Sequence, residues 1–94
     1  MRFELLEGSA TVQTASTIRR LMADGTQWRV RVETWHDGEC WRGRLLFDPD
    51  QPVRDDLGVR FGPPTLRGRT REEVVASAHE VPERRLRVVL RSLL

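Results

Sequence analysis

The feature that most constrains the fold is a pair of alternating segments in the middle of the chain. Residues 28–35, WRVRVETW, alternate large apolar with mostly charged side chains, and residues 40–47, CWRGRLLF, continue this alternation in most positions. Such alternation is typical of a β-strand that is buried on one face only. Between the segments lies Asp37-Gly38, a dipeptide that favours two-residue hairpin loops because a type I′ turn requires positive φ at both central positions. The two segments therefore predict an antiparallel hairpin.

The register of this hairpin follows if Asp37 and Gly38 alone form the loop. One face then pairs Trp28 with Phe47, Val30 with Leu45, Val32 with Gly43 and Thr34 with Trp41. The other face pairs Arg29 with Leu46, Arg31 with Arg44, Glu33 with Arg42 and Trp35 with Cys40. The first face suits a core, and the second suits solvent, with one cross-strand ion pair and one repulsive arginine pair. A slip of one residue would mix the two faces, so the pattern favours this register.

A second Asp-Gly dipeptide, Asp24-Gly25, precedes the hairpin and indicates another turn. The apolar side chains of residues 16–23 are spaced in a way that fits either a short helix or a strand. A helix of this length is marginal, and a turn directly before a clear strand suggests an antiparallel neighbour. We therefore favour a strand, with the helix as the alternative. Its register stays open because the simplest pairings turn Arg19 or Arg20 inward.

The chain after the hairpin predicts a fourth short strand. Residues 48–56 are polar and broken by proline, which is typical of a loop, and Leu57, Val59 and Phe61 then alternate with smaller or charged residues. The Pro63-Pro64 pair ends this strand, since proline cannot donate a hydrogen bond to a neighbouring strand.

Two helices are expected at the C-terminal end. Thr70-Arg71-Glu72-Glu73 matches a capping box, in which the threonine hydroxyl accepts from the Glu73 amide and the Glu73 carboxylate reaches back. This motif predicts a helix up to about Glu80, buried through Val74, Val75 and Ala78. Pro82 is expected in the first turn of a second helix. The apolar stripe of that helix has the spacing i, i+3, i+4, i+7 and comprises Leu86, Val89, Leu90 and Leu93.

Strands followed by helices, without β-α-β alternation, predict an α+β fold. We expect an antiparallel β-meander of about four strands, packed on one face by two C-terminal helices. The 94 residues suit a single small domain, in which residues 1–15 form an N-terminal arm that could be partly disordered. Glu4 and Glu7 interrupt the apolar stretch at the start, which argues against a secretory signal peptide, and no segment approaches membrane-spanning length. We therefore expect a cytoplasmic protein.

The sequence carries no recognisable catalytic or cofactor motif. His36 and His79 have no second histidine or cysteine at a ligand spacing, so we expect no metal. Cys40 is the single cysteine, and an enzymatic hypothesis would have to pair it with His36 without a third orienting group or an oxyanion hole. The glycines form neither a P-loop nor a dinucleotide fingerprint. We therefore expect a protein that is not an enzyme and needs no cofactor.

The solvent face of the hairpin is the one candidate binding surface. All 16 basic side chains of the chain are arginine, yet the formal net charge is only +2. The predicted register gathers arginines and one tryptophan on this face, with a further arginine added if the fourth strand pairs beside it. The candidate residues are Arg29, Arg31, Trp35, Arg42, Arg44 and Arg60. An exposed tryptophan suggests that something covers it.

Three interpretations of this face are open. A chain without lysine fills exposed strand positions with arginine, so the face could be solvated only. Arginine and tryptophan are also favoured at the centres of protein interfaces, which suits a protein partner or a homodimer. Phosphates and stacked bases would suit the same side chains, so nonspecific nucleic-acid binding is the alternative function. Of the functional interpretations, we favour a small protein-interaction module.

A local pattern within residues 17–47 adds a resemblance. An arginine-containing strand and an Asp-Gly turn precede the pattern Trp-x-Gly-x-Leu-x-Phe. The residues concerned are Arg20, Asp24, Gly25, Trp28, Trp41, Gly43, Leu45 and Phe47. In this combination the segment resembles small bacterial proteins of unknown function with paired Asp-Gly hairpins. The resemblance implies no activity, because each of these residues already has a structural role in the hairpins.

Overall fold

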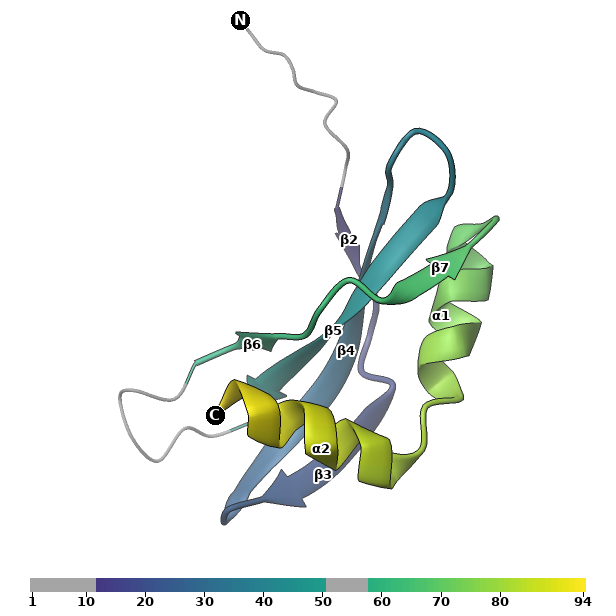
Figure 1. Ribbon diagram of the computed structural model, residues 1–94. Coiled ribbons are helices and arrows are strands. Elements are labelled where there is room, and N and C mark those ends of the chain that lie inside the picture. Colours follow the sequence, from purple (N-terminus) through teal and green to yellow (C-terminus); the bar gives the residue numbers. More distant parts are fainter. Residues whose placement is uncertain (1–11, 51–57) are drawn as a thin grey trace, which may run out of the picture.

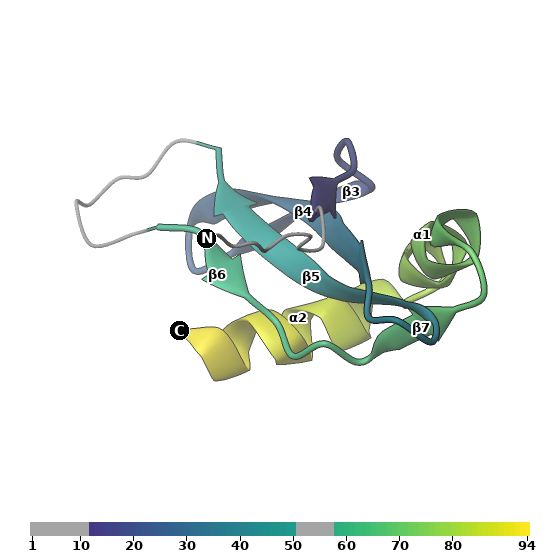
Figure 2. The same cartoon turned by 90° about the horizontal axis from the view of Figure 1, so that it is seen from above.

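A computed structural model describes residues 12–50 and 58–94 of the chain. In this part, an antiparallel β-sheet is packed on one face by two helices (Figures 1 and 2). The two long central strands are β4, Thr26–His36, and β5, Trp41–Pro49. The α+β fold predicted from the sequence is therefore confirmed.

Each central strand is flanked on its outer edge by two short strands. β2 (Gln13–Thr14) and β3 (Arg19–Ala23) both pair with β4, whereas β6 (Arg60–Phe61) and β7 (Leu66–Gly68) both pair with β5. At each edge of the sheet, therefore, one stretch of chain pairs with the central strand, departs from it for a few residues and then pairs with it again. The described sheet consequently has four strand positions built from six strands.

The sequence did not predict β2 and β7. β2 lies in the segment assigned to the N-terminal arm, and β7 lies between the Pro63-Pro64 pair and the first helix, where no strand was expected. Both strands are too short for an alternating pattern to emerge. The strand predicted at Leu57, Val59 and Phe61 is shorter in the structure, where only β6 forms. Leu57 and most of the predicted N-terminal arm lie outside the described residues.

The loop between β4 and β5 contains residues 37–40 and not Asp37-Gly38 alone, so the predicted loop is wrong. The Asp37 N–H donates to the Cys40 carbonyl at 3.1 Å. In return, Asp37 Oδ1 accepts from the backbone N–H groups of Cys40 and Glu39, each at 2.9 Å. These hydrogen bonds, first that from Cys40 and then that from Glu39, lower the pKa of Asp37 from 3.8 to about 2, with Arg42 contributing less. The aspartate side chain thereby replaces the tight turn with a wider one.

The wider loop shifts the β4–β5 register by two residues from the predicted one. Val30 lies opposite Phe47, where the prediction placed Leu45. Because side chains alternate with a period of two, a shift of two residues leaves every side chain on its predicted face. The predicted core face of the hairpin is therefore confirmed, although its cross-strand pairs are not.

The first Asp-Gly dipeptide does form a two-residue loop, between β3 and β4. Asp24 and Gly25 have φ angles of 52° and 77°, and the residues that flank them pair with each other. The strand favoured for residues 16–23 is confirmed as β3. Arg19 does face the helix side of the sheet, but it lies at the end of the strand and forms an ion pair with Glu83 at 3.4 Å.

The two predicted helices are present as α1 (Arg71–His79) and α2 (Glu83–Leu93). Thr70 caps α1, because its hydroxyl accepts from the Glu73 N–H at 3.1 Å. The second half of the predicted capping box differs, since the Glu73 carboxylate accepts from the backbone N–H of Arg69 at 2.8 Å and not from that of Thr70. The helix still gains both hydrogen bonds at its N-terminal end.

The core lies between the sheet and the helices. Its fully buried side chains include Trp28, Val30, Val32 and Phe47 from the sheet and Val74, Leu86 and Leu90 from the helices. α1 approaches β5 closely at Gly43, where an added Cβ atom would lie 2.5 Å from Val74 Cγ1. The glycine therefore allows the helix to sit directly on the strand. No helix among the described residues is long and apolar enough to span a membrane.

Candidate functional site: the open face of the sheet

The face of the sheet turned away from α1 and α2 is the surface on which the sequence placed the candidate residues (Figure 2). We call it the open face. Its described residues on the two central strands are Gln27, Arg29, Arg31, Glu33 and Trp35 of β4 and Arg42, Arg44, Leu46 and Asp48 of β5, and the edge strands add Thr14 of β2, Arg20 and Met22 of β3, Phe61 of β6 and Arg67 of β7. Directly paired residues of an antiparallel sheet share a face, which assigns these side chains.

Five of the six predicted site residues lie on the open face, and Arg60 does not. Arg60 pairs with Phe47, a fully buried core residue, so its side chain is directed to the helix side of the sheet. Its neighbour Phe61 takes the place on the open face, opposite Leu46. The sequence pattern had suggested that Phe61 faces the core and Arg60 faces solvent. The pairing of β6 with β5 shows the reverse.

At one end of the open face, two arginines share two aspartates. Asp48 Oδ2 lies 3.1 Å from Arg29 and 3.4 Å from Arg31, and Asp50 Oδ1 lies 2.7 Å from Arg29 Nε. Asp48 directly faces Arg29 across the β4–β5 ladder. The sequence analysis missed these acids because it ended the second strand at Phe47, although the even-numbered residues 46, 48 and 50 continue the same alternation.

The two arginines that β5 contributes to the face, Arg42 and Arg44, also have acidic partners. Arg42 lies 3.4 Å from Asp37 and also donates to the backbone carbonyl of Pro64 at 3.0 Å. Arg44 Nε donates to Glu33 Oε1 at 2.6 Å. The predicted pair of Glu33 with Arg42 and the predicted repulsion between two arginines are therefore both wrong, because the shifted register places Glu33 opposite Arg44.

These pairs change the electrostatic character of the open face. Each of its four arginines on β4 and β5 lies within ion-pair distance of a carboxylate. Partly exposed pairs of this kind stabilise a fold by only about 0–1 kcal/mol each. They nevertheless offset much of the positive charge that an anionic partner would need. Over β4 and β5, the open face is therefore a mixed-charge surface and not a cationic one.

An aromatic cluster surrounds one of these arginines. The guanidinium carbon of Arg44 lies 4.6 Å from the ring centre of Phe61 and 5.8 Å from that of Trp35. Distances below about 6 Å allow cation–π attraction. With its Nε bound to Glu33, the guanidinium is held in position from three directions.

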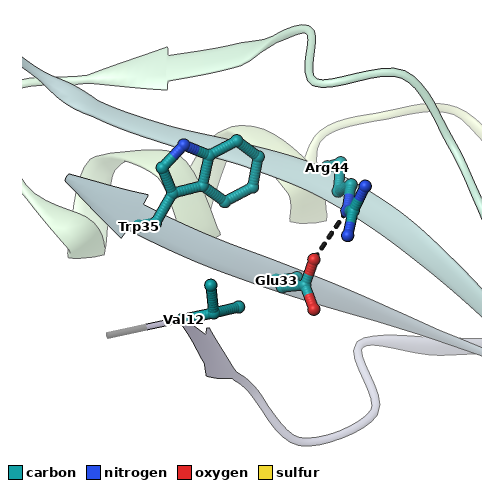
Figure 3. A pocket seen from close by; sticks show the side chains of 4 residues that line it. All are labelled: Val12, Glu33, Trp35 and Arg44. Atoms are coloured by element: carbon teal, nitrogen blue, oxygen red, sulfur yellow. Dashed lines mark hydrogen bonds and ion pairs between the residues drawn. The ribbon is translucent and has the colours of Figure 1, made fainter. Parts of the chain in front are cut away.

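A shallow hollow lies beside this cluster (Figure 3). Its lining residues are Val12, Glu33, Trp35 and Arg44, and its volume is about 200 Å³. Figure 3 shows the Trp35 ring above β4 with Val12 below it and the Glu33–Arg44 hydrogen bond at the far side. Val12 is 51% exposed and Phe61 is 47% exposed, so apolar surface adjoins the hollow. Neither Val12 nor Phe61 was expected at this surface from the sequence.

Cys40 and His36, which an enzymatic hypothesis would pair, have other partners. His36 Nδ1 accepts from the Gly38 N–H at 3.0 Å, and its ring packs edge-on against Trp41. The Cys40 thiol lies 4.0 Å from Asp37 Oδ2. Within residues 12–50 and 58–94, no group of three or more histidine, cysteine, aspartate or glutamate side chains could hold a metal ion.

Comparisons of the chain with protein-family models, with curated proteins and with solved structures gave no match. Inference about function therefore rests on the geometry of the open face itself. That geometry combines apolar surface, a positioned guanidinium and largely balanced charge.

Proposed function

We propose that the protein is a non-enzymatic interaction module that binds another protein through the open face. The observation that supports this proposal best is the cluster in which Trp35 and Phe61 flank Arg44. Aromatic side chains and arginine contribute most of the binding energy in protein interfaces, particularly where neighbouring contacts exclude water. Glu33 holds the guanidinium in place, so little side-chain entropy would be lost on binding.

The size of the hollow also favours a protein partner over a small molecule. Small-molecule sites usually enclose about 300–1,000 Å³. The hollow at Trp35 has a volume of about 200 Å³. It suits one apolar side chain of a partner, inserted beside Val12, with the surrounding ion pairs forming a polar rim.

Nucleic-acid binding by the same face is the weaker alternative. A phosphate would have to compete with Asp48 for Arg29 and Arg31, and with Glu33 for Arg44. Affinity for nucleic acid depends chiefly on neutralising phosphates with unpaired cations. The described ion pairs oppose this and are compatible with a protein surface of mixed charge.

Site-specific photo-crosslinking in the cells that produce the protein would test the proposal. A photoreactive phenylalanine analogue is placed at Phe61, on the open face, and in a matched control at Val88, on the outer side of α2. Both positions are exposed, at 47% and 62%, so neither replacement should unfold the chain. We expect discrete protein adducts from position 61 that are absent from position 88, and adducts of twice the chain mass would identify a homodimer.

Two further observations complete the test. Arg44→Glu should abolish the adducts from position 61, because it reverses the charge that Trp35 and Phe61 flank. Equal adducts from positions 61 and 88, or none from either, would contradict the proposal and leave the open face as a solvated surface.

A further inference from the structure

A second cavity lies on the opposite side of the molecule from the open-face hollow, at the edge of the core. Segments distant in the sequence build it: β5, the start of β7, the connection between α1 and α2, and α2 itself. Its lining residues are Leu45, Thr65, Leu66, Val81, Pro82, Arg85 and Val89. Its volume of about 310 Å³ reaches the range of small-molecule sites, which the hollow at Trp35 does not.

The wall of this cavity is mainly apolar. Leu45 is almost fully buried at its base, and Leu66, Val81 and Val89 are each half-buried around it. These aliphatic side chains belong to the margin of the core, so their positions are fixed by packing. An apolar ligand would cover them at a gain of about 25 cal/mol for each Å² removed from water.

Arg85 is the only charged residue that lines the cavity in the part of the chain that the structure describes. Arg85 and Val89 are one helical turn apart on α2. Arg85 is exposed and Val89 is half-buried, so the arginine lies on the solvent side of the cavity, at its mouth. Arg85 has no ion pair with any acid of residues 12–50 or 58–94. The nearby Glu83 is engaged elsewhere, with Oε1 on Arg19 and Oε2 on Arg87. The electrostatics of the mouth therefore favour an anion.

We propose that this cavity binds a small amphipathic carboxylate, with its aliphatic body against Leu66 and Val89 and its carboxylate at Arg85. A guanidinium presents two parallel N–H donors that match a carboxylate, and such charge-assisted hydrogen bonds are about twice as strong as neutral ones. Thr65, which also lines the cavity, offers a hydroxyl as a further hydrogen-bonding group. This site is separate from the open face, so it does not depend on the proposed protein interaction.

Amide-resolved NMR titration with hexanoate tests the proposal, and hexan-1-ol and hexylammonium serve as probes of equal chain length without the carboxylate. We expect saturable shifts at Leu66, Val81 and Val89 with hexanoate. Binding of hexan-1-ol should be weaker by about 3- to 10-fold, because the charge-assisted hydrogen bond is lost. Hexylammonium should be weaker still.

Arg85→Gln and the matched control Arg84→Gln separate the role of the guanidinium from a change in net charge. Both arginines are exposed on α2, but Arg84 does not line the cavity. Arg85→Gln should reduce hexanoate affinity to that of hexan-1-ol, while Arg84→Gln should leave it nearly unchanged. The proposal is overturned if hexanoate gives no saturable shifts at the cavity, or if both variants weaken it equally.

Discussion

Replacement of Gly43 by alanine is the sharpest test of the packing between α1 and the sheet. The new Cβ atom would lie 2.5 Å from Val74 Cγ1 and 3.1 Å from the Glu33 carbonyl oxygen. Carbon atoms pack best at about 3.5–4.0 Å, so the first contact is about 1 Å too short. Overpacking of a core costs about 1–3 kcal/mol, and the reduced entropy of the unfolded chain returns about 0.4–1 kcal/mol. The two ranges leave a net loss of about 0–2.6 kcal/mol in the free energy of unfolding, and the short contact with Val74 favours the middle of that range, about 1–2 kcal/mol.

The assay is urea unfolding of four proteins: the parent chain, Gly43→Ala, Val74→Ala and the double variant. Val74→Ala alone leaves a cavity, but in the double variant the removed methyl groups make room for the new Cβ atom. The double variant should therefore lose about 1 kcal/mol less than the sum of the two single losses, because residues in contact are not additive. Additive losses would refute the reasoning, since they would mean that α1 does not lie on Gly43.

Three further predictions concern the loop, the core and the helix cap. The folded-state pKa of Asp37 is lowered to about 2, so the stability that this carboxylate contributes is fully present above about pH 4 and is lost as the pH falls toward 2. Asp37→Asn should therefore flatten this part of the pH–stability profile, measured by thermal unfolding. Leu90→Ala should cost about 2–5 kcal/mol in chemical denaturation, whereas Val88→Ala on the exposed side of the same helix should cost less than about 0.5 kcal/mol. Thr70→Ala should cost about 1 kcal/mol in the same assay and Thr70→Ser much less, and equal losses would argue against the cap.

The faces of the central hairpin were predictable from the sequence, but its register was not. Alternation assigns Val30 and Phe47 to the core whichever of the two registers is adopted, since the registers differ by two residues. The loop length that decides between them depends on the Asp37 carboxylate, which accepts two backbone hydrogen bonds and widens the turn. The other Asp-Gly dipeptide, Asp24-Gly25, does form the two-residue loop that is expected for this sequence.

Alternation predicts that the candidate residues of the hairpin share one face of the sheet, but it does not identify their acidic partners. The alternation of the hairpin is sufficient to place Trp35 and the four arginines of β4 and β5 on the open face. Their acidic partners depend on the register and on the length of β5, and Asp48 lies just beyond the residues that the pattern identified. Phe61 and Arg60 lie on the opposite faces from those expected, because the pairing with β5 decides their faces and a strand of two residues offers no alternation from which to assign them. The cavity at Arg85 requires several distant segments to meet, which no local pattern reveals.

The claim that acidic partners make the open face a protein-binding and not a phosphate-binding surface can be measured directly. The measurement is an amide-resolved NMR titration of the chain with short single-stranded and duplex oligonucleotides, at low and then at physiological salt. We expect no shifts confined to residues 29–35 and 42–44, because Asp48, Asp37 and Glu33 already pair with the arginines of these segments. Shifts confined to those residues at low salt that fade as salt is added, through counterion release, would contradict the account and make the open face a nucleic-acid-binding surface.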